Sequence, residues 1–578
     1  MELISPSFLT FATVILGIAI MAFFRPKAAS ASDPITKMIS STAFIGSQTG
    51  GESVINYSYT DLPWTLMLWD IYYFFHYLWA IFYVVWPMTP TDSGELSELS
   101  FTRGNMLSLG VHMILVVLQL GFIIALPFMV LLPVWTAVGV IAGFMAVNKL
   151  LCVILNGRGD QVEYHSDPEY AEAKKEHEGE VWIFINGVAA GEHWMKSNLN
   201  RLAVTFKRPI LGIHNKTVLY SAELAVLVTD FFFSPRVERK LLTTSLDATK
   251  DVRVCYRIIK EKLYDPQNTK VVFILHSQGG IEGSLIIDWL LQELPQDLLS
   301  KLEVYTFGNA ANHFNNPHRH VRSQRVAFRN PLAAKTDSTL KEDDGTTTNG
   351  TGGTEPQPEA RAPPEQLQEE KVPSFTSLTS STCSSRPSAI SDRAIGHIEH
   401  YAHTTDFVAL WGVLHFTTST LDSPTLPRFI GRVFARSSPR GGHQFVQHYL
   451  DGMFPLQRDA NGNLLRDKDG TLVGCVEEGE NEFMESEVVI GGDKSQRDEG
   501  DEIEEEHDGD GEVGESVQIH SVSPIILRKR GTFRREGSSK PVKMKVRELS
   551  RLWQYRDGRN PEEFKGRRKR EVRKGVTL

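Results

Sequence analysis

The sequence predicts an α/β domain with a mostly parallel sheet, preceded by membrane helices and followed by a disordered, charged tail. Long apolar runs fill the first part of the chain, short apolar strands alternate with helical patterns in its middle, and runs of like charge occupy its end. The chain has 578 residues, which exceeds one compact domain, and its formal net charge of −9 is unevenly distributed.

The predicted membrane region covers residues 1–156 and begins with an apolar segment at 8–24. A run of about 17 residues is just long enough to cross the hydrocarbon core of a bilayer. We expect an uncleaved anchor. A signal peptide begins with basic residues, whereas the residues before this run include Glu2 and contain no Lys or Arg. A cleaved signal peptide is the alternative, since small residues follow at 28–32.

Two further apolar segments complete the membrane region. The segment at 62–88 is rich in Trp and Tyr, which prefer the membrane interface, and predicts a span or an interfacial helix. A buried helix of a soluble domain is the alternative. The segment at 106–155 contains no Asp, Glu or Arg and has about twice the length of one span. We expect a helical hairpin that turns near Pro133, because proline interrupts helices.

The α/β domain is predicted at 179–457, because buried strands alternate there with helical segments. The expected strands lie at 181–185, 210–213, 271–275, 302–307, from about 398 to the loop before 406, and at 427–436. The expected helices lie at 194–206, 246–263, 279–294 and 445–453.

Two polar regions interrupt or follow this domain. The stretch at 333–392 has almost no large apolar residues and predicts a disordered insert. Residues 458–578 predict a mostly disordered tail, acidic and then basic. Within the tail, Val546, Leu549 and Trp553 share one helical face. Contact of this basic piece with anionic lipid headgroups is the alternative to a solvated tail.

The segment from Leu275 to Gly280, LHSQGG, lies between an expected strand and an expected helix. A serine at this turn projects its hydroxyl above the sheet edge, which makes Ser277 the candidate nucleophile and the backbone N–H of Gln278 a candidate oxyanion donor. The G-x-S-x-G pattern has a small residue two positions before the serine, whereas this chain has Leu275, which we expect to crowd the turn. The alternative is a serine that only caps the helix.

A serine nucleophile requires a base and an acid that orients the base. Asp406, just beyond the strand that follows the insert, is the candidate acid, in preference to Asp392 and Asp422. His443, in a glycine loop after the last expected strand, is the candidate base, and His448 is the alternative base. Each of these residues could instead be an ordinary loop or surface residue.

Gly187 and Val188 follow the first strand of the domain and are candidates for a second backbone oxyanion donor. We expect neither a metal nor a cofactor. Histidines spaced by three residues at 397, 400 and 403 alternate between the faces of a strand and do not converge. The four cysteines lack zinc-ribbon spacing, and the sequence has no dinucleotide or P-loop motif.

These residues resemble lipase-type α/β-hydrolases. The YTFGN segment at 305–309 and Asp406-Phe407-Val408 are similar to the layout of class 3 lipases. The segments HSQGG at 276–280, FGNAANHF at 307–314 and QHYL at 447–450 resemble uncharacterised membrane-anchored hydrolase-like proteins of fungi. The resemblance covers about 180–330 and 395–457. It implies an α/β-hydrolase fold and serine esterase or lipase chemistry, and leaves the substrate open.

The expected function is therefore a membrane-anchored serine hydrolase that cleaves a lipid or another hydrophobic carboxylic ester. The alternatives are a catalytically weak or inactive hydrolase-like membrane scaffold and an acyltransferase that uses the same three residues. The expected partners are membrane lipids and the ester substrate, with protein partners through the charged tail as a further option and no nucleic acid. We expect an integral membrane protein of the endomembrane system.

Overall fold

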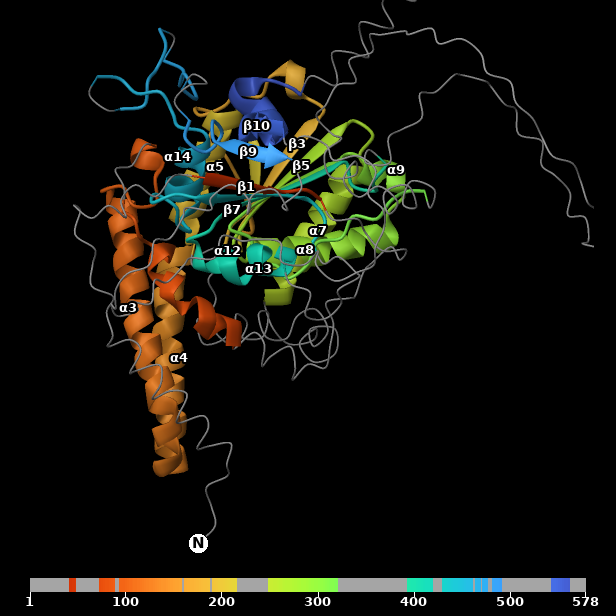
Figure 1. Ribbon diagram of the computed structural model, residues 1–578. Coiled ribbons are helices and arrows are strands. Elements are labelled where there is room, and N and C mark those ends of the chain that lie inside the picture. Colours follow the sequence, from red (N-terminus) through yellow and green to blue (C-terminus); the bar gives the residue numbers. More distant parts are fainter. Residues whose placement is uncertain are drawn as a thin grey trace, which may run out of the picture.

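The chain folds into an α/β domain with a helical hairpin that projects from it (Figure 1). The computed structural model describes residues 41–47, 72–88, 93–157, 161–187, 190–215, 248–320, 392–418, 429–460, 463–468, 470–476, 481–490 and 542–561. The predicted anchor at 8–24 and the predicted insert, apart from Asp392, lie outside these residues.

A mostly parallel sheet of eight strands forms the centre of the domain, in the order β1-β8-β7-β6-β5-β3-β4-β2. Neighbouring strands from β8 to β4 run parallel, and β1 and β2 close the two edges in antiparallel orientation. The strands are β1 (Ser41–Ile45), β2 (Glu163–His165), β3 (Glu180–Ile185), β4 (Ile210–Ile213), β5 (Lys270–His276), β6 (Leu302–Phe307), β7 (His397–His403) and β8 (Arg432–Ser437). The prediction of a mostly parallel α/β sheet is confirmed.

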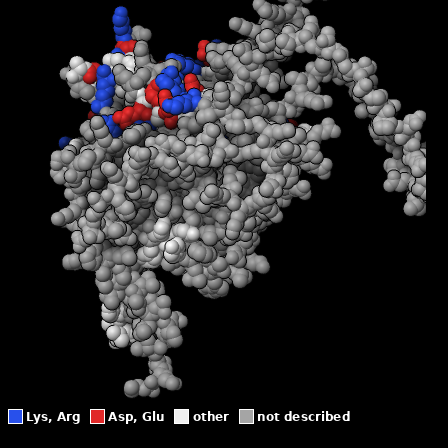
Figure 2. Space-filling view, in the orientation of Figure 1, with Lys and Arg blue, Asp and Glu red and all other residues white. Residues whose placement is uncertain are grey.

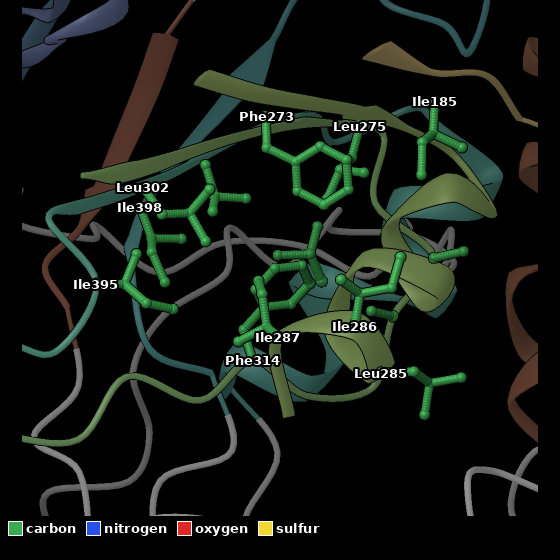
Figure 3. Close-up of a cluster of buried hydrophobic side chains, with 14 of the residues drawn as sticks. Ile185, Phe273, Leu275, Leu285, Ile286, Ile287, Leu302, Phe314, Ile395 and Ile398 are labelled. Atoms are coloured by element: carbon green, nitrogen blue, oxygen red, sulfur yellow. The ribbon is translucent and has the colours of Figure 1, made fainter. Parts of the chain in front are cut away.

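Both faces of the sheet are buried, which explains the nearly continuous apolar character of its strands. In β5, Phe273 and Leu275 face one core, and Val272 and Ile274 face the other. The first core lies between the sheet and two helices, α7 (Ala248–Tyr264) and α8 (Gly279–Glu293). Figure 3 shows side chains of this core, with those of β5 above those of α8.

The second core lies on the opposite face and includes side chains of α5 (Glu192–Phe206) and of η7 (Phe445–Leu450), a short π-helix. The remaining helices of the described chain are η2 (Leu78–Val84), η3 (Gly94–Leu96), α3 (Arg103–Ala125), η4 (Leu126–Leu131), α4 (Val134–Asn156), η5 (Lys175–His177), α9 (Gln296–Leu299), α12 (Phe407–Trp411), α13 (Val413–Thr418), α14 (Asp451–Met453), α15 (Val546–Leu549) and η11 (Leu552–Gly558).

The hairpin consists of α3, η4 and α4, and its turn at Pro133 confirms the predicted break. By length and composition α4 can cross a membrane, since its 23 residues rise about 34 Å at 1.5 Å per residue. It is the one helix in the described part of the chain that is both long enough and apolar enough to do so. At the base of the hairpin, Asn105 accepts a hydrogen bond from Trp194 Nε1 of α5 (3.0 Å), and the ring of Trp194 stacks on His112.

The second apolar segment lies on the α/β domain rather than apart from it, within its described part, 72–88. Phe74 packs edge-on against Trp411 and Phe407 of α12, at ring-centroid distances of 5.4 and 5.5 Å. The other side of this segment is open, because Phe82 is 74% and Trp86 60% exposed. The described part of this segment therefore packs on the domain with one side and exposes the other.

The predicted tail at 458–578 is folded in part, since residues 458–460, 463–468, 470–476, 481–490 and 542–561 lie within the described chain. Residues 481–490 and 542–561 contribute a two-stranded sheet of β9 (Glu487–Ile490) and β10 (Val542–Lys545), followed by α15 and η11. Val546, Leu549 and Trp553 are buried in the second core, so the apolar face covers the domain instead of contacting lipid headgroups. Acidic and basic side chains are intermixed at this end of the domain, opposite the hairpin (Figure 2).

Candidate active site

Every candidate site residue of the described chain follows the carboxyl end of a parallel strand. Gly187 follows β3, Ser277 follows β5, Asp406 follows β7 and His443 follows β8. Because the carboxyl ends of parallel strands meet at one edge of the sheet, side chains distant in sequence come together there. This edge is where open α/β sheets bind their ligands.

Ser277 occupies a strained turn between β5 and α8. Its φ angle is +57°, in the left-handed region that residues other than glycine seldom adopt. The turn is tight, since a Cβ atom on Gly279 would lie 3.0 Å from the carbonyl oxygen of Ile185 in β3. The serine is therefore held at the start of α8, in the position that the strand-serine-helix pattern predicts.

Leu275 does not crowd this turn, contrary to the expectation from the sequence. Its side chain is fully buried in the first core and lies against Gly283, one helical turn beyond Gly279. A Cβ atom on Gly283 would overlap the terminal carbons of Leu275. In the usual pattern a small residue at position 275 would leave room for the helix. Here Gly283 of α8 leaves room for the leucine instead.

His443 faces the serine hydroxyl. With Nδ1–H directed at Asp406, its Nε2 accepts a hydrogen bond from Ser277 Oγ at 2.9 Å. The backbone of His443 is held from two sides: its N–H donates to the carbonyl of Tyr83 (3.0 Å), and its carbonyl accepts from His276 Nε2 (2.9 Å). The rings of His276 and His443 stack at 4.9 Å. Burial lowers the pKa of His276 to about 3, so it is a neutral support at physiological pH.

Asp406 divides its two oxygens between the histidine and a helix. Oδ2 accepts hydrogen bonds from His443 Nδ1 (2.9 Å) and from the hydroxyl of Tyr449 (2.7 Å). Oδ1 accepts the N–H groups of Val408 and Ala409 and so caps α12. Burial alone would raise the pKa of Asp406, but the charge of His443 and these hydrogen bonds outweigh it and hold the pKa below its usual range.

The glycine after β6 allows this close approach. Gly308 has a φ angle of +52°, and a Cβ atom there would lie 2.7 Å from Asp406 Oδ2 and 3.1 Å from His443 Nδ1. A side chain at this position would occupy the space of the histidine-aspartate hydrogen bond.

His448, the alternative base, faces away from the serine. Its Nδ1 accepts a hydrogen bond from the N–H of Gln444, and its Nε2 donates to the carbonyl of Pro87, both at 2.9 Å. Burial lowers the pKa of His448 to about 4. The alternative acids differ as well: Asp392 pairs with His320 (3.0 Å), and Asp422 lies outside the described residues.

Two of the three candidate oxyanion donors, Gln278 and Gly187, lie next to Ser277. Gln278 directly follows the serine and is the N-cap residue of α8. A Cβ atom on Gly187 would lie 2.6 Å from Ser277 Cβ, so Gly187 forms the wall facing the nucleophile. The side chain of Asn186 donates to the carbonyl of Gly187 (2.8 Å) and fixes that peptide group. Val188 lies outside the described residues.

The histidines of β7 do not form a metal cluster. His397 pairs with Glu399, His400 with Thr306, and His403 with the carbonyl of His448. No group of metal-binding side chains occurs among the described residues.

Three supporting residues escaped the sequence-based prediction: Tyr449, His276 and Asn186. Tyr449 and His276 act on partners distant in sequence, Asp406 and His443, whereas Asn186 acts on the neighbouring peptide group of Gly187. The QHYL segment that contains Tyr449 was recognised only as part of a resemblance, and nothing in its spacing points to an aspartate 43 residues earlier.

Comparisons with known proteins leave this geometry as the main guide to function. A scan against protein-family models found no match, and neither a search of curated proteins nor a search of solved structures found one.

Proposed function

We propose that the protein is a serine hydrolase of the α/β-hydrolase type that cleaves a carboxylic ester. The observation that carries this proposal is the hydrogen-bonded series Ser277-His443-Asp406, with both links at 2.9 Å. A serine on a positive-φ turn between a parallel strand and a helix adds support. The order serine, acid, histidine along the chain is the order used by that fold.

The reaction follows from these positions. Ser277 Oγ attacks the ester carbonyl while His443 Nε2 takes the hydroxyl proton, and Asp406 stabilises the imidazolium. His443 then returns the proton to the departing alcohol, leaving an acyl group on Ser277. Water, deprotonated by His443, attacks the acyl group, and the acid is released as His443 returns the proton to Ser277 Oγ. Backbone N–H groups near Gln278 and Gly187 stabilise the negative oxygen formed in both steps.

The proposed substrate is a lipid or another hydrophobic ester. The proposed location of the enzyme is the endomembrane system, where it would be an integral membrane protein. Support comes from α4, which can cross a bilayer, and from the exposed Trp79, Phe82 and Trp86 beside the histidine loop. The backbone of Tyr83, in the same aromatic segment, accepts a hydrogen bond from His443. If these aromatic side chains contact the membrane interface, the site would lie at the surface where a lipid substrate is found. The inactive-scaffold alternative loses its main argument, because Leu275 fits against Gly283.

Fluorophosphonate labelling of the detergent-solubilised full chain tests the proposal. We expect wild type to react and Ser277→Ala to lose labelling completely. Because general-base catalysis typically contributes about 10²–10⁴-fold, His443→Ala should slow labelling by that factor. Asp406→Asn should also slow it, since the histidine loses its orienting carboxylate.

His448→Gln tests the alternative base, because His448 lies in η7 and its Nε2 donates to the carbonyl of Pro87 and not to Ser277. Its labelling should stay clearly faster than that of His443→Ala, because the change alters a contact of η7 and leaves the base in place. A folded wild type that does not react, or a His448→Gln variant as slow as His443→Ala, would contradict the proposed mechanism. Release of free acid rather than a new ester distinguishes hydrolysis from acyl transfer.

A further inference from the structure

The segment between η2 and α3 lies against the helix that follows the candidate base. In this segment Glu98 is buried, and its carboxylate accepts the N–H of Val446 at 3.0 Å and the N–H of Gln447 at 3.4 Å. Both amides belong to the first turn of η7, which begins two residues after His443. First-turn amides have no acceptor within their own helix, so Glu98 supplies the acceptors that fix this end of η7.

The position of η7 affects both links of the triad. At its start the chain leaves His443, and near its end Tyr449 donates to Asp406. Segment 83–88 holds the same helix further, because the carbonyl of Pro87 accepts from Gln447 Nε2 (2.7 Å) and His448 Nε2 (2.9 Å). Residues before the hairpin therefore form one wall of the site.

Burying the charged carboxylate of Glu98 costs free energy. Burial, aided by the negative charge of Asp451, raises the pKa of Glu98 to about 7, although the hydrogen bonds from η7 lower it. Asp451 is itself paired with Arg201 of α5 (3.3 Å). A neutral side chain could fill the space at lower cost, which suggests that the two acceptor oxygens of Glu98 serve a purpose beyond packing.

We infer that Glu98 is a positioning residue, which holds η7 so that His443 Nε2 stays within hydrogen-bonding distance of Ser277 Oγ. The inference rests on the proposed function. It also links the site to the hairpin, since α3 begins five residues after Glu98 and Asn105 of α3 is anchored to α5 through Trp194. The catalytic histidine and the base of the hairpin are held by one continuous stretch of chain.

The test compares Glu98→Gln, Glu98→Asp and the matched control Glu95→Gln, whose glutamate is exposed in the same segment. For each full-length variant in detergent, we would measure the second-order rate constant of fluorophosphonate labelling, the final labelled fraction and the melting temperature. Glu98→Gln presents an amide NH₂ towards two N–H donors, so we expect labelling at least tenfold slower that still reaches the wild-type fraction. Glu98→Asp, which keeps the charge, should recover part of the rate, and Glu95→Gln should match wild type.

An unchanged rate in Glu98→Gln would overturn the inference. So would a smaller labelled fraction that reacts at the wild-type rate, since that result indicates a purely structural role. If Glu98→Gln does not fold, Glu98→Asp decides: a slower rate supports positioning, and the wild-type rate overturns it. Absence of Ser277-dependent labelling in wild type would overturn both this inference and the proposed function, whereas labelled wild type with an unaffected Glu98→Gln overturns positioning alone.

Discussion

At the scale of single residues, the candidate nucleophile depends on glycines placed where its neighbours need space. Gly187 faces Ser277, Gly308 faces the pair of His443 and Asp406, and Gly283 receives Leu275. The sequence predicted Gly187 as a site residue because it follows the first strand of the domain. No local pattern pairs Gly283 with Leu275 or Gly308 with His443 and Asp406, because only the folded chain brings these residues together.

Leu275→Ala tests whether the leucine before the serine turn weakens the site or supports it. Removing a fully buried leucine side chain should cost about 2–5 kcal/mol in the free energy of unfolding. We expect no increase in the rate of fluorophosphonate labelling, because the leucine is accommodated by Gly283. Urea denaturation and labelling kinetics measure the two quantities.

The double variant Leu275→Ala, Gly283→Ala provides the control. The added methyl group fills part of the cavity, so the double variant should be more stable than the sum of its two single changes predicts. Additive losses, or faster labelling in Leu275→Ala, would show that the leucine does strain the serine turn.

At the scale of elements, residues 542–561, here called the C-terminal piece, are held to the domain by buried ion pairs as well as by apolar contacts. Arg551 donates from Nε and Nη2 to Glu303 Oε1 at 3.1 and 3.0 Å, and its backbone N–H donates to Glu399. Both glutamates lie near the amino ends of central strands, opposite the candidate site. The attraction of Arg551 and Lys270 keeps the pKa of Glu303 below its usual value despite complete burial.

Arg551→Met should therefore destabilise the domain strongly. Loss of one partner leaves a buried charge uncompensated, which typically costs about 3–5 kcal/mol. Lys543→Met is the matched control, because Lys543 pairs with Glu487 on the surface of the same piece, where loss of an ion pair costs about 0–1 kcal/mol. Equal unfolding free energies of the two variants would contradict an integral role of η11 and its ion pairs.

The elements that the sequence predicted and those that it missed differ in a physical way. The central strands and the helices that cover them carry continuous apolar patterns, and the structure confirms them. The edge strands β1 and β2 are short and take their partners from remote segments, so no local pattern marks them. In the C-terminal piece the apolar residues are widely spaced among charges, and burial depends on a surface that only the folded domain provides.

At the scale of the whole molecule, buried neutral histidines make stability depend on pH. Burial lowers the pKa of His276 and His400 to about 3 and of His403 and His448 to about 4. Below the unfolded value of about 6.5, the unfolded chain binds more protons at these positions, so the folded state loses stability as pH falls. Glu98 has the opposite effect, about as large as that of one histidine. Because its pKa is raised in the folded state, its protonation stabilises the fold as pH falls from about 7 to 4.5.

We expect the free energy of unfolding to be lower at pH 5.5 than at pH 7. The change His403→Gln, which retains a donor for the carbonyl of His448, should reduce this dependence by at most about 1.4 kcal/mol per pH unit, with the largest effect at the acid end of the range. The exposed His165, changed to Gln, should leave it unaltered. Urea denaturation across this range measures the slope, and a slope unaffected by His403→Gln would contradict the assignment.

The two edge strands also constrain how the chain could be threaded through a bilayer. β1 ends before the hairpin and β2 begins after it, yet both belong to the same sheet. Residues 46–162 must therefore cross a membrane an even number of times, so a crossing by α4 requires a second crossing that returns the chain. Single cysteines introduced at Ala43 and Glu163 should react with an impermeant thiol reagent from the same side of sealed vesicles, whereas opposite sidedness would be incompatible with the sheet. Parity thus follows from strand pairing alone, without knowledge of which side of the membrane the sheet occupies.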